Sequence, residues 1–182
     1  MHAVPNVRYL PRFLADADAA FAELLQATPW RQDKIRIMGR EIAQPRLTAW
    51  YGEAAATYTY SGLTLAPLTF TPLLARICAE VQAVAGDRFN SALLNHYRDG
   101  ADSVSWHSDN EPELGRDPII ASVSLGATRR FDLRRRDEHG IRASFELEHG
   151  SLLLMREGCQ TGWQHRIAKT KAAGGPRDNL AF

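Results

Sequence analysis

The stretch SVSWHSDNEPELG, residues 103–115, combines a short β-type run with the loop that ends it. His107 and Asp109 are two residues apart, so both side chains lie on one face if the run is a strand. An imidazole and a carboxylate placed in this way form either a simple hydrogen-bonded pair or two of the three ligands of a metal ion. The surrounding sequence bears on that choice.

The 103–115 stretch belongs to a series of eight short β-type runs, which turn residues such as Gly and Asp separate. They are NSALLNHY, SVSWHSD, IIASVSLG, RRFDLRRR, ASFELEHG, SLLLMRE, GWQHRIA and DNLAF, between residues 90 and 182. Two helical segments precede them, at residues 14–30 and 71–86. This order predicts an α+β fold whose core is a barrel or a jelly roll.

Both helical segments carry end signals. Thr71 suits the N-cap of the second helix, Pro72 its first position and Gly86 the position just past its end. An Asp lies near the start of the first helix, and Thr28-Pro29 stops it.

The bulk properties describe a single ordinary domain. The chain has 182 residues, of which 45% are hydrophobic and 24% charged, and its net charge is +1. The overall charge is therefore too small to attract a nucleic acid or a membrane surface. Cys78 and Cys159 are isolated, without a CxxC pair, so the sequence suggests neither a disulfide framework nor a thiolate zinc site. Without an 18-residue apolar run or a signal-peptide core, the sequence predicts a reduced, soluble, cytoplasmic monomer with no membrane partner.

A third metal ligand is available later in the β series. His165 in GWQHRI completes an HxD…H pattern, the sequence form of a 2-His-1-carboxylate set that leaves coordination positions open on Fe(II). HxD alone is more often structural, and the chain has six His in all. His2, His96, His139 and His149 lack comparable partner spacing and are interpreted as surface or core residues.

The last run adds a buried cation to the pattern. Arg177 and Asn179 share one face of the final strand, and an Arg that faces a barrel interior requires a carboxylate partner. A dicarboxylate co-substrate would supply it. Asn95 and Tyr97 alternate in the same way on LLNHYRDG and could donate hydrogen bonds into that interior, although Tyr97 could equally be a core aromatic.

Taken together, these stretches resemble the AlkB family of Fe(II)/2-oxoglutarate-dependent dioxygenases, and most closely its DNA-repair branch. The likeness runs from about residue 34 to the end, through PRLTAWYGEAAATYTYSG, LLNHYRDGADSVSWHSDNE, IIASVSLGATRRFDLRRR, HGSLLLM and PRDNLAF. The family's last strand usually reads Arg-x-Asn-x-Thr-Phe-Arg. Here Ala181 stands at the Thr position, and the second Arg would follow Phe182.

The resemblance implies a double-stranded β-helix (jelly roll) that holds iron through His107, Asp109 and His165. It also implies that 2-oxoglutarate is held by Asn95, Tyr97, Arg177 and Asn179, with Arg177 on the carboxylate far from the metal, and that O2 is the co-substrate. The single domain, residues 1–182, would comprise a nucleotide-recognition lid at about residues 30–65 and a catalytic core at about residues 90–182.

The resemblance further implies a nucleic-acid surface around the lid. Met38 stands where an apolar wedge would enter the base stack, and Glu111 resembles the acidic residue that reads the exocyclic amine of an alkylated base. Tyr58 and Tyr60 would stack on a flipped base, or could be plain strand packing. Other contacts assigned on this basis are Gly39, Arg40, Arg46, Ser61, Arg134, Arg135, Arg136, Lys169 and Lys171. An Arg run is otherwise usually a solvated face.

The favoured expectation is therefore an enzyme that demethylates N-alkylated bases such as 1-methyladenine and 3-methylcytosine in DNA, releasing formaldehyde, succinate and CO2. Two alternatives stay open: the same chemistry on RNA or protein, and a non-enzymatic jelly-roll binding module with a vestigial iron site.

Overall fold

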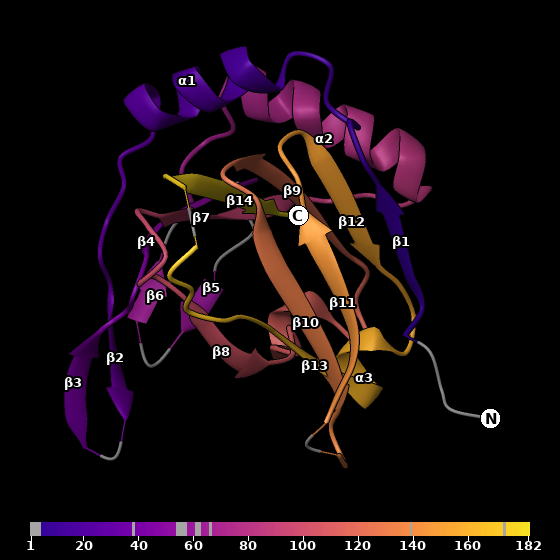
Figure 1. The fold of residues 1–182 in the computed structure, drawn as a ribbon. Helices are drawn as coiled ribbons and strands as arrows, with labels where there is room; N and C mark the ends of the chain where they lie inside the picture. Colours follow the sequence, from indigo (N-terminus) through magenta and orange to yellow (C-terminus); the bar gives the residue numbers. More distant parts are fainter. Residues whose placement is uncertain are drawn as a thin grey trace.

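A computed structural model describes residues 5–37, 39–53, 58–60, 63–65, 67–138, 140–172 and 174–182. Two antiparallel sheets face each other, and two helices lie across the top of one of them (Figure 1). The larger sheet has the strand order β1-β12-β9-β14-β7-β4, and the smaller one β11-β10-β13-β8. The predicted α+β fold with a jelly-roll core is confirmed.

All eight predicted β runs form strands. They are β7 (Ser91–Tyr97), β8 (Val104–His107), β9 (Ile120–Gly126), β10 (Arg129–Arg135), β11 (Ile141–Leu147), β12 (Ser151–Met155), β13 (Trp163–Ile167) and β14 (Arg177–Ala181). Two short helices not predicted from the sequence lie between them, the 3₁₀ turn η1 (Pro112–Leu114) and α3 (Cys159–Gly162).

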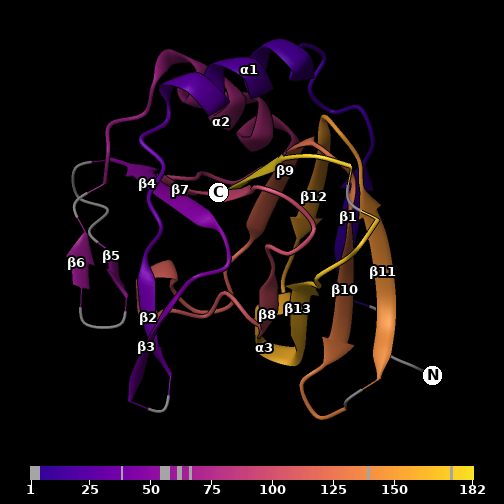
Figure 2. The same ribbon diagram turned by 60° about the vertical axis from the view of Figure 1, so that its left-hand side comes forward.

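The N-terminal part contributes further strands. β1 (Val7–Leu10) pairs with β12, and β4 (Leu47–Gly52) pairs with β7, so both strands extend the larger sheet. Two hairpins stand apart as separate sheets: β2 (Lys34–Ile37) with β3 (Arg40–Ala43), and β5 (Tyr58–Tyr60) with β6 (Leu63–Leu65). Both hairpins lie on the same side of the molecule, next to β4 (Figure 2). Part of the range predicted as a lid therefore belongs to the core sheet.

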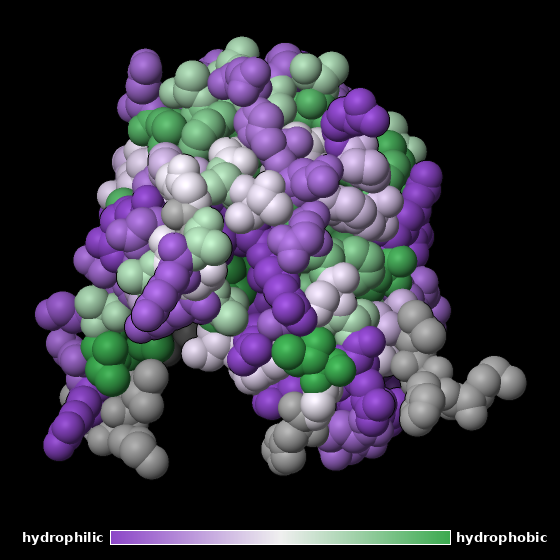
Figure 3. Space-filling view, viewed as in Figure 1, coloured by the Kyte–Doolittle hydropathy of each residue, from purple (hydrophilic) through white to green (hydrophobic). Residues whose placement is uncertain are grey.

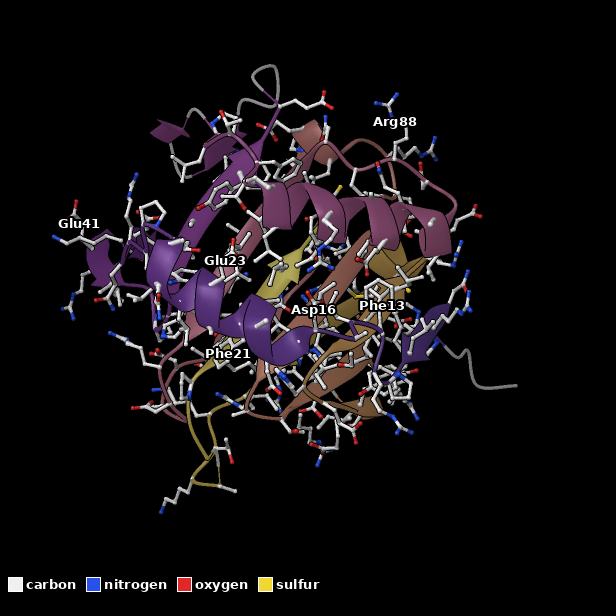
Figure 4. All side chains as sticks on the ribbon, turned by 90° about the horizontal axis from the view of Figure 1, so that it is seen from above. Phe13, Asp16, Phe21, Glu23, Glu41 and Arg88 are labelled. Carbon is white, nitrogen blue, oxygen red and sulfur yellow. The ribbon has the colours of Figure 1, made fainter. Side chains whose placement is uncertain are left out.

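The helices α1 (Ala17–Ala27) and α2 (Pro72–Ala85) lie side by side over the outer face of the larger sheet, as the view from above shows (Figure 4). Thr71 caps α2 by accepting a hydrogen bond from the Leu74 N–H, and Gly86 adopts the left-handed conformation with φ 72°, as predicted. Asp16 lies between the helices in Figure 4, where Arg76 of α2 pairs with it at 2.6 Å. No helix in the described part of the chain is long and apolar enough to cross a membrane.

The alternation of residues along the strands separates two hydrophobic clusters. One cluster, between the helices and the larger sheet, includes Leu74, Ile77 and Leu94. The other, between the two sheets, includes Leu133 and Leu153. Side chains at odd positions of β7 and β14 point toward the second cluster, because neighbours along a strand face opposite sides of its sheet. This alternation directs polar side chains into the space between the sheets.

Candidate metal centre and active site

Three potential metal ligands meet between the two sheets. His107 and His165 are directly opposite in the β8–β13 ladder, and their rings lie 4.2 Å apart between centroids. Asp109 Oδ2 lies 3.3 Å from His165 Nε2, and Asp109 Oδ1 lies 3.6 Å from His107 Nε2. One ligand atom from each residue lies within 4.8 Å of the others. The three side chains could therefore hold one metal ion on a single face.

The local structure positions each of these side chains. β8 ends at His107, so Asp109 lies in the loop just after the strand. Its backbone N–H donates to Oε1 of Gln160, a fully buried residue of α3, at 2.9 Å. His107 Nδ1 lies 2.8 Å from the Ser105 carbonyl oxygen, which leaves Nε2 toward the metal position, and the His165 ring stacks on Phe131. Contacts of this kind set the orientation of metal ligands.

The electrostatic environment favours the protonation states that bind a metal. Burial, together with the neighbouring His165, lowers the pKa of His107 to about 4, so the imidazole is neutral at pH 7. Burial opposes ionisation of Asp109, but the contacts with His165 and His107 outweigh it and lower the pKa of that carboxyl. Neutral imidazoles and a carboxylate form the ligand set of non-haem iron sites.

A second polar group lies beside the metal position on the larger sheet. Arg177 pairs with Tyr97, and Asn179 pairs with Asn95, across the β14–β7 ladder, so the four residues alternate into the space between the sheets. Arg177 is 1% exposed and donates to Ser124 Oγ at 2.9 Å, while its Nε and Nη1 have no hydrogen-bond partner within the described part of the chain. Burial lowers the pKa of this guanidinium. A buried fork with two unpaired nitrogens fits the carboxylate of a bound dicarboxylate.

A cavity of about 640 Å³ joins these groups. Its lining includes the three potential metal ligands and the residues Asn95, Tyr97, Arg177 and Asn179, and it extends to Arg46 and Glu111. Arg46 Nε donates to Asn95 Oδ1 at 2.8 Å, so this predicted substrate residue contacts the predicted co-substrate group. The surface is hollowed between the β2–β3 hairpin and the lower ends of β10 and β11, with apolar patches on either side (Figure 3). Ile42 on β3 and Ile141 on β11 are among the exposed large apolar residues.

The residues predicted to contact nucleic acid are scattered, and those engaged within the protein include Arg134 and Arg135 besides Arg46. Arg134 lies over the Trp106 ring at 4.4 Å and donates to Gln164 Oε1, and Arg135 pairs with Asp137. Exposed residues of this set are Gly39, Arg40, Arg136, Lys169 and Lys171. Met38 and Ser61 lie outside the described residues, and only the backbone of Tyr58 and Tyr60, in β5, is described.

Sequence reasoning missed two residues that contact the site, Arg129 beside the Tyr97 ring and Gln160 on the Asp109 backbone. Arg129 belongs to the same Arg-rich stretch, RRFDLRRR, as Arg134 and Arg135, but it is 3% exposed and donates to the carbonyl oxygens of Asp99, Asp102 and Ala168. Its place in the alternation of β10, in phase with Phe131, could have revealed that it points inward. No sequence pattern marks Gln160, because its hydrogen bond to the Asp109 backbone depends on a contact between α3 and the loop after β8.

Of the four other histidines, the described two are His96 and His149. His96 is buried and pairs with Asp178 at 2.6 Å on the helix-facing side of the larger sheet. His149 Nδ1 accepts a hydrogen bond from the Gly126 N–H. Neither residue lines the cavity, in agreement with their interpretation as core or surface residues.

Comparisons with known proteins agree with this geometry. Residues 6–182 match the 2OG-Fe(II) oxygenase superfamily. The human alpha-ketoglutarate-dependent dioxygenase alkB homolog 3 is 44% identical over 190 residues, covering 98% of this chain and 66% of that protein. The mouse DNA oxidative demethylase ALKBH2 is 40% identical over 178 residues, covering 92% of this chain and 74% of the relative.

A solved structure of OsALKBH1 superposes with a TM-score of 0.63 at 17% sequence identity, covering 100% of this chain and 99% of that one, which supports the fold. The chain spans 62–66% of the length of the mammalian alkB homolog 3 proteins that it matches. The match to the superfamily over nearly all of the sequence, and the identity to alkB homologues, show that this chain belongs to the AlkB family of 2OG-Fe(II) oxygenases.

Proposed function

We propose that the chain is an Fe(II)- and 2-oxoglutarate-dependent dioxygenase that removes methyl groups from N-alkylated bases in DNA. The observation that carries the proposal is the pairing of a three-ligand cluster with a buried, incompletely hydrogen-bonded Arg177 in one cavity. The relatives support the DNA substrate, since the ALKBH2 proteins at 39–40% identity are named DNA oxidative demethylases.

The residues present fit both groups that the superfamily uses. His107, Asp109 and His165 would hold Fe(II), since one ligand atom of each lies within 4.8 Å of the others. Three protein ligands would leave coordination positions for co-substrates. Arg177 would take the distal carboxylate of 2-oxoglutarate, because a guanidinium fork with unpaired N–H groups matches a carboxylate. When bound, iron with 2-oxoglutarate and O2 supplies the oxidation that yields succinate, CO2, formaldehyde and the demethylated base.

The protein's own contribution is orientation and shelter. Gln160 holds the backbone of Asp109 in the loop after β8, and Ser122 donates to Asn179 Oδ1 on the larger sheet, so both groups are positioned before any ligand arrives. Apolar residues such as Phe131 and Met155 line the same cavity and would shield the reacting groups from bulk water once a substrate is bound. Glu111 lines the cavity near the metal ligands, where a carboxylate can accept from the exocyclic amine of a base.

Formaldehyde release tests the proposal directly. The protein would be incubated with Fe(II), 2-oxoglutarate and oligonucleotides that carry 1-methyladenine or 3-methylcytosine, on DNA and RNA backbones, with Asp109→Ala as the control. We expect release from methylated DNA that depends on both cofactors and on Asp109. Release from RNA alone would assign the substrate to RNA. Absence of release from every oligonucleotide, despite 2-oxoglutarate turnover, would refute the nucleic-acid substrate.

A further inference from the structure

A polar cluster lies in the part of the cavity formed by the β2–β3 hairpin and the start of β4. Asp33 is satisfied there, since Arg31 Nη2 donates to its Oδ1 at 3.0 Å and Thr48 Oγ1 donates to its Oδ2 at 2.9 Å. Gln44 also lines the cavity and is 5% exposed, but its Oε1 has no hydrogen-bond partner among the residues that the structure describes. Buried polar atoms without a partner are uncommon in folded proteins, and each one needs an explanation.

Two described residues of the cavity lining carry buried, unpaired side-chain atoms: Arg177 and Gln44. Arg177, on β14 between the sheets, is a cation and suits the co-substrate carboxylate. Gln44 is neutral and lies in the connection from β3 to β4. Its amide offers one acceptor and one donor group side by side, and a 180° turn of the amide exchanges them. It therefore suits the edge of a base that carries a donor beside an acceptor.

The backbone around Gln44 is held firmly. The Gln44 N–H donates to the Asp33 carbonyl at 2.8 Å, and Gln32 Nε2 donates to the Gln44 carbonyl at 2.9 Å. The next carbonyl, of Pro45, accepts from the Ser103 N–H just before β8, and Arg46 reaches Asn95. The segment is thus tied both to the strand that carries His107 and to the predicted co-substrate site. A side chain presented from such a segment loses little freedom when it binds a ligand.

We propose that Gln44 recognises the Hoogsteen edge of a methylated adenine, with its amide oxygen accepting from N6–H and its amide N–H donating to N7. This rests on the proposed function. Glutamine pairs with this edge of adenine through two hydrogen bonds. A methyl group on N1 blocks part of the Watson–Crick edge, so N6 and N7 form the remaining donor–acceptor pair. Cytosine offers its amine but no ring acceptor on the corresponding side, so the contact favours 1-methyladenine over 3-methylcytosine.

Removal of N7 from the substrate tests the contact. DNA oligonucleotides with 1-methyladenine or 1-methyl-7-deazaadenine differ only in that a C–H replaces N7. For the wild-type protein we expect kcat/KM to fall about tenfold on the 7-deaza base, the order of discrimination of a bidentate base contact. Gln44→Leu should be slower on 1-methyladenine and show no further loss on the 7-deaza base. Gln44→Glu, which keeps acceptors but lacks the donor, should also be insensitive to N7.

Gln26→Leu is the control. It removes an exposed amide of α1 that does not line the cavity and does not contact Gln44, and it should keep the wild-type ratio between the two bases. Because the ratio is taken within each variant, a partly unfolded preparation does not alter it. Equal kcat/KM values of the wild-type protein on the two bases, or an unchanged ratio in Gln44→Leu, would overturn the proposal.

The affinity for the same two oligonucleotides, measured by fluorescence anisotropy, separates this proposal from the proposed function. An N7-dependent affinity that Gln44→Leu abolishes would support recognition by Gln44 even if no formaldehyde were released. Formaldehyde release without any N7 dependence of rate or affinity would leave the demethylase function standing and reject the role of Gln44.

Discussion

Arg177 and Tyr97 lie opposite each other in the β14–β7 ladder, with the Arg177 guanidinium carbon 5.1 Å from the centroid of the Tyr97 ring. The guanidinium carbon of Arg129 lies 5.7 Å from the same centroid. Two buried cations therefore share one aromatic ring, and neither has a carboxylate among its side-chain hydrogen bonds within the described residues. Such an arrangement favours the binding of an anion between the sheets.

Replacement of Arg177 should weaken the binding of 2-oxoglutarate. Truncation of one partner of a buried charge pair costs about 2–5 kcal/mol, so Arg177→Ala should raise the apparent KM for 2-oxoglutarate about 30-fold or more. The apparent KM of Arg177→Lys should lie between those of the wild-type protein and Arg177→Ala, because an ammonium keeps the charge but lacks the planar fork. The measurement is the initial rate of succinate formation against 2-oxoglutarate concentration, with the partly exposed Arg135→Ala as control. An unchanged KM would assign the distal carboxylate to another residue.

Replacement of Asp109 should abolish the metal site without unfolding the protein. Asp109 lies in a loop after β8, and the hydrogen bond to Gln160 uses its backbone N–H rather than its side chain. We expect Asp109→Ala to lose binding of Mn(II), a spectroscopic substitute for Fe(II), and Fe(II)-dependent turnover, while the melting temperature of the metal-free protein stays within a few degrees. Asp137→Ala is the control. Near-native turnover in Asp109→Ala would refute the three-ligand site.

Replacement of Gln160 should affect both stability and metal binding. Gln160→Leu leaves the Asp109 N–H without its acceptor in a partly buried position, and a donor left unsatisfied in this way costs about 1–3 kcal/mol. The free energy of unfolding from urea titration should fall by that amount, and the affinity for Mn(II) should weaken because the Asp109 loop is less well held. Gln26→Leu, on the exposed face of α1, is the control. Loss of stability with unchanged Mn(II) affinity would show that Gln160 supports the fold alone.

The pKa of His107 predicts how the stability of the metal-free protein depends on pH. Folding lowers this pKa from its usual 6.5 to about 4, so between these values the unfolded chain binds more protons at this site than the folded one. The contribution of His107 to the free energy of unfolding therefore falls as the pH falls from 6.5 to 4. Melting temperatures of the metal-free protein across this range should decrease more steeply than those of His107→Gln. If the melting temperatures of the two proteins fell in parallel across this pH range, the lowered pKa of His107 would be contradicted.

The Arg run should contribute unequally to nucleic-acid binding. Arg134 is engaged with Trp106 and Gln164, and Arg135 with Asp137, whereas the exposed Arg136 has no side-chain partner within the described ranges. If Arg136 contacts a phosphate, Arg136→Ala should reduce the slope of log affinity against log salt by up to about 0.9 on duplex DNA. Affinities at two salt concentrations test this, with Arg135→Ala expected to have less effect. An unchanged slope would place Arg136 on a solvated face.

Local patterns in the sequence determined much of this protein. The period-2 runs form strands β7 to β14. Thr71 caps the start of α2 and Gly86, in the left-handed conformation, ends it. The sequence also predicted that Arg177 and Asn179 share one face of the last strand, because the face on which a strand residue lies depends only on its position in the run. The family resemblance added roles for those positions.

The tertiary structure decided which of these residues meet. β1 and β4 joined the larger sheet through pairing with strands far along the chain, which no local period encodes. The arginines of RRFDLRRR lie in two different environments. Arg129 points into the core, whereas Arg134 packs on the outer face of the smaller sheet. Gln160 and Gln44 gained their significance only from neighbours distant in sequence. Burial and long-range pairing depend on the whole packed chain, because the surfaces that remove a side chain from water come from distant segments.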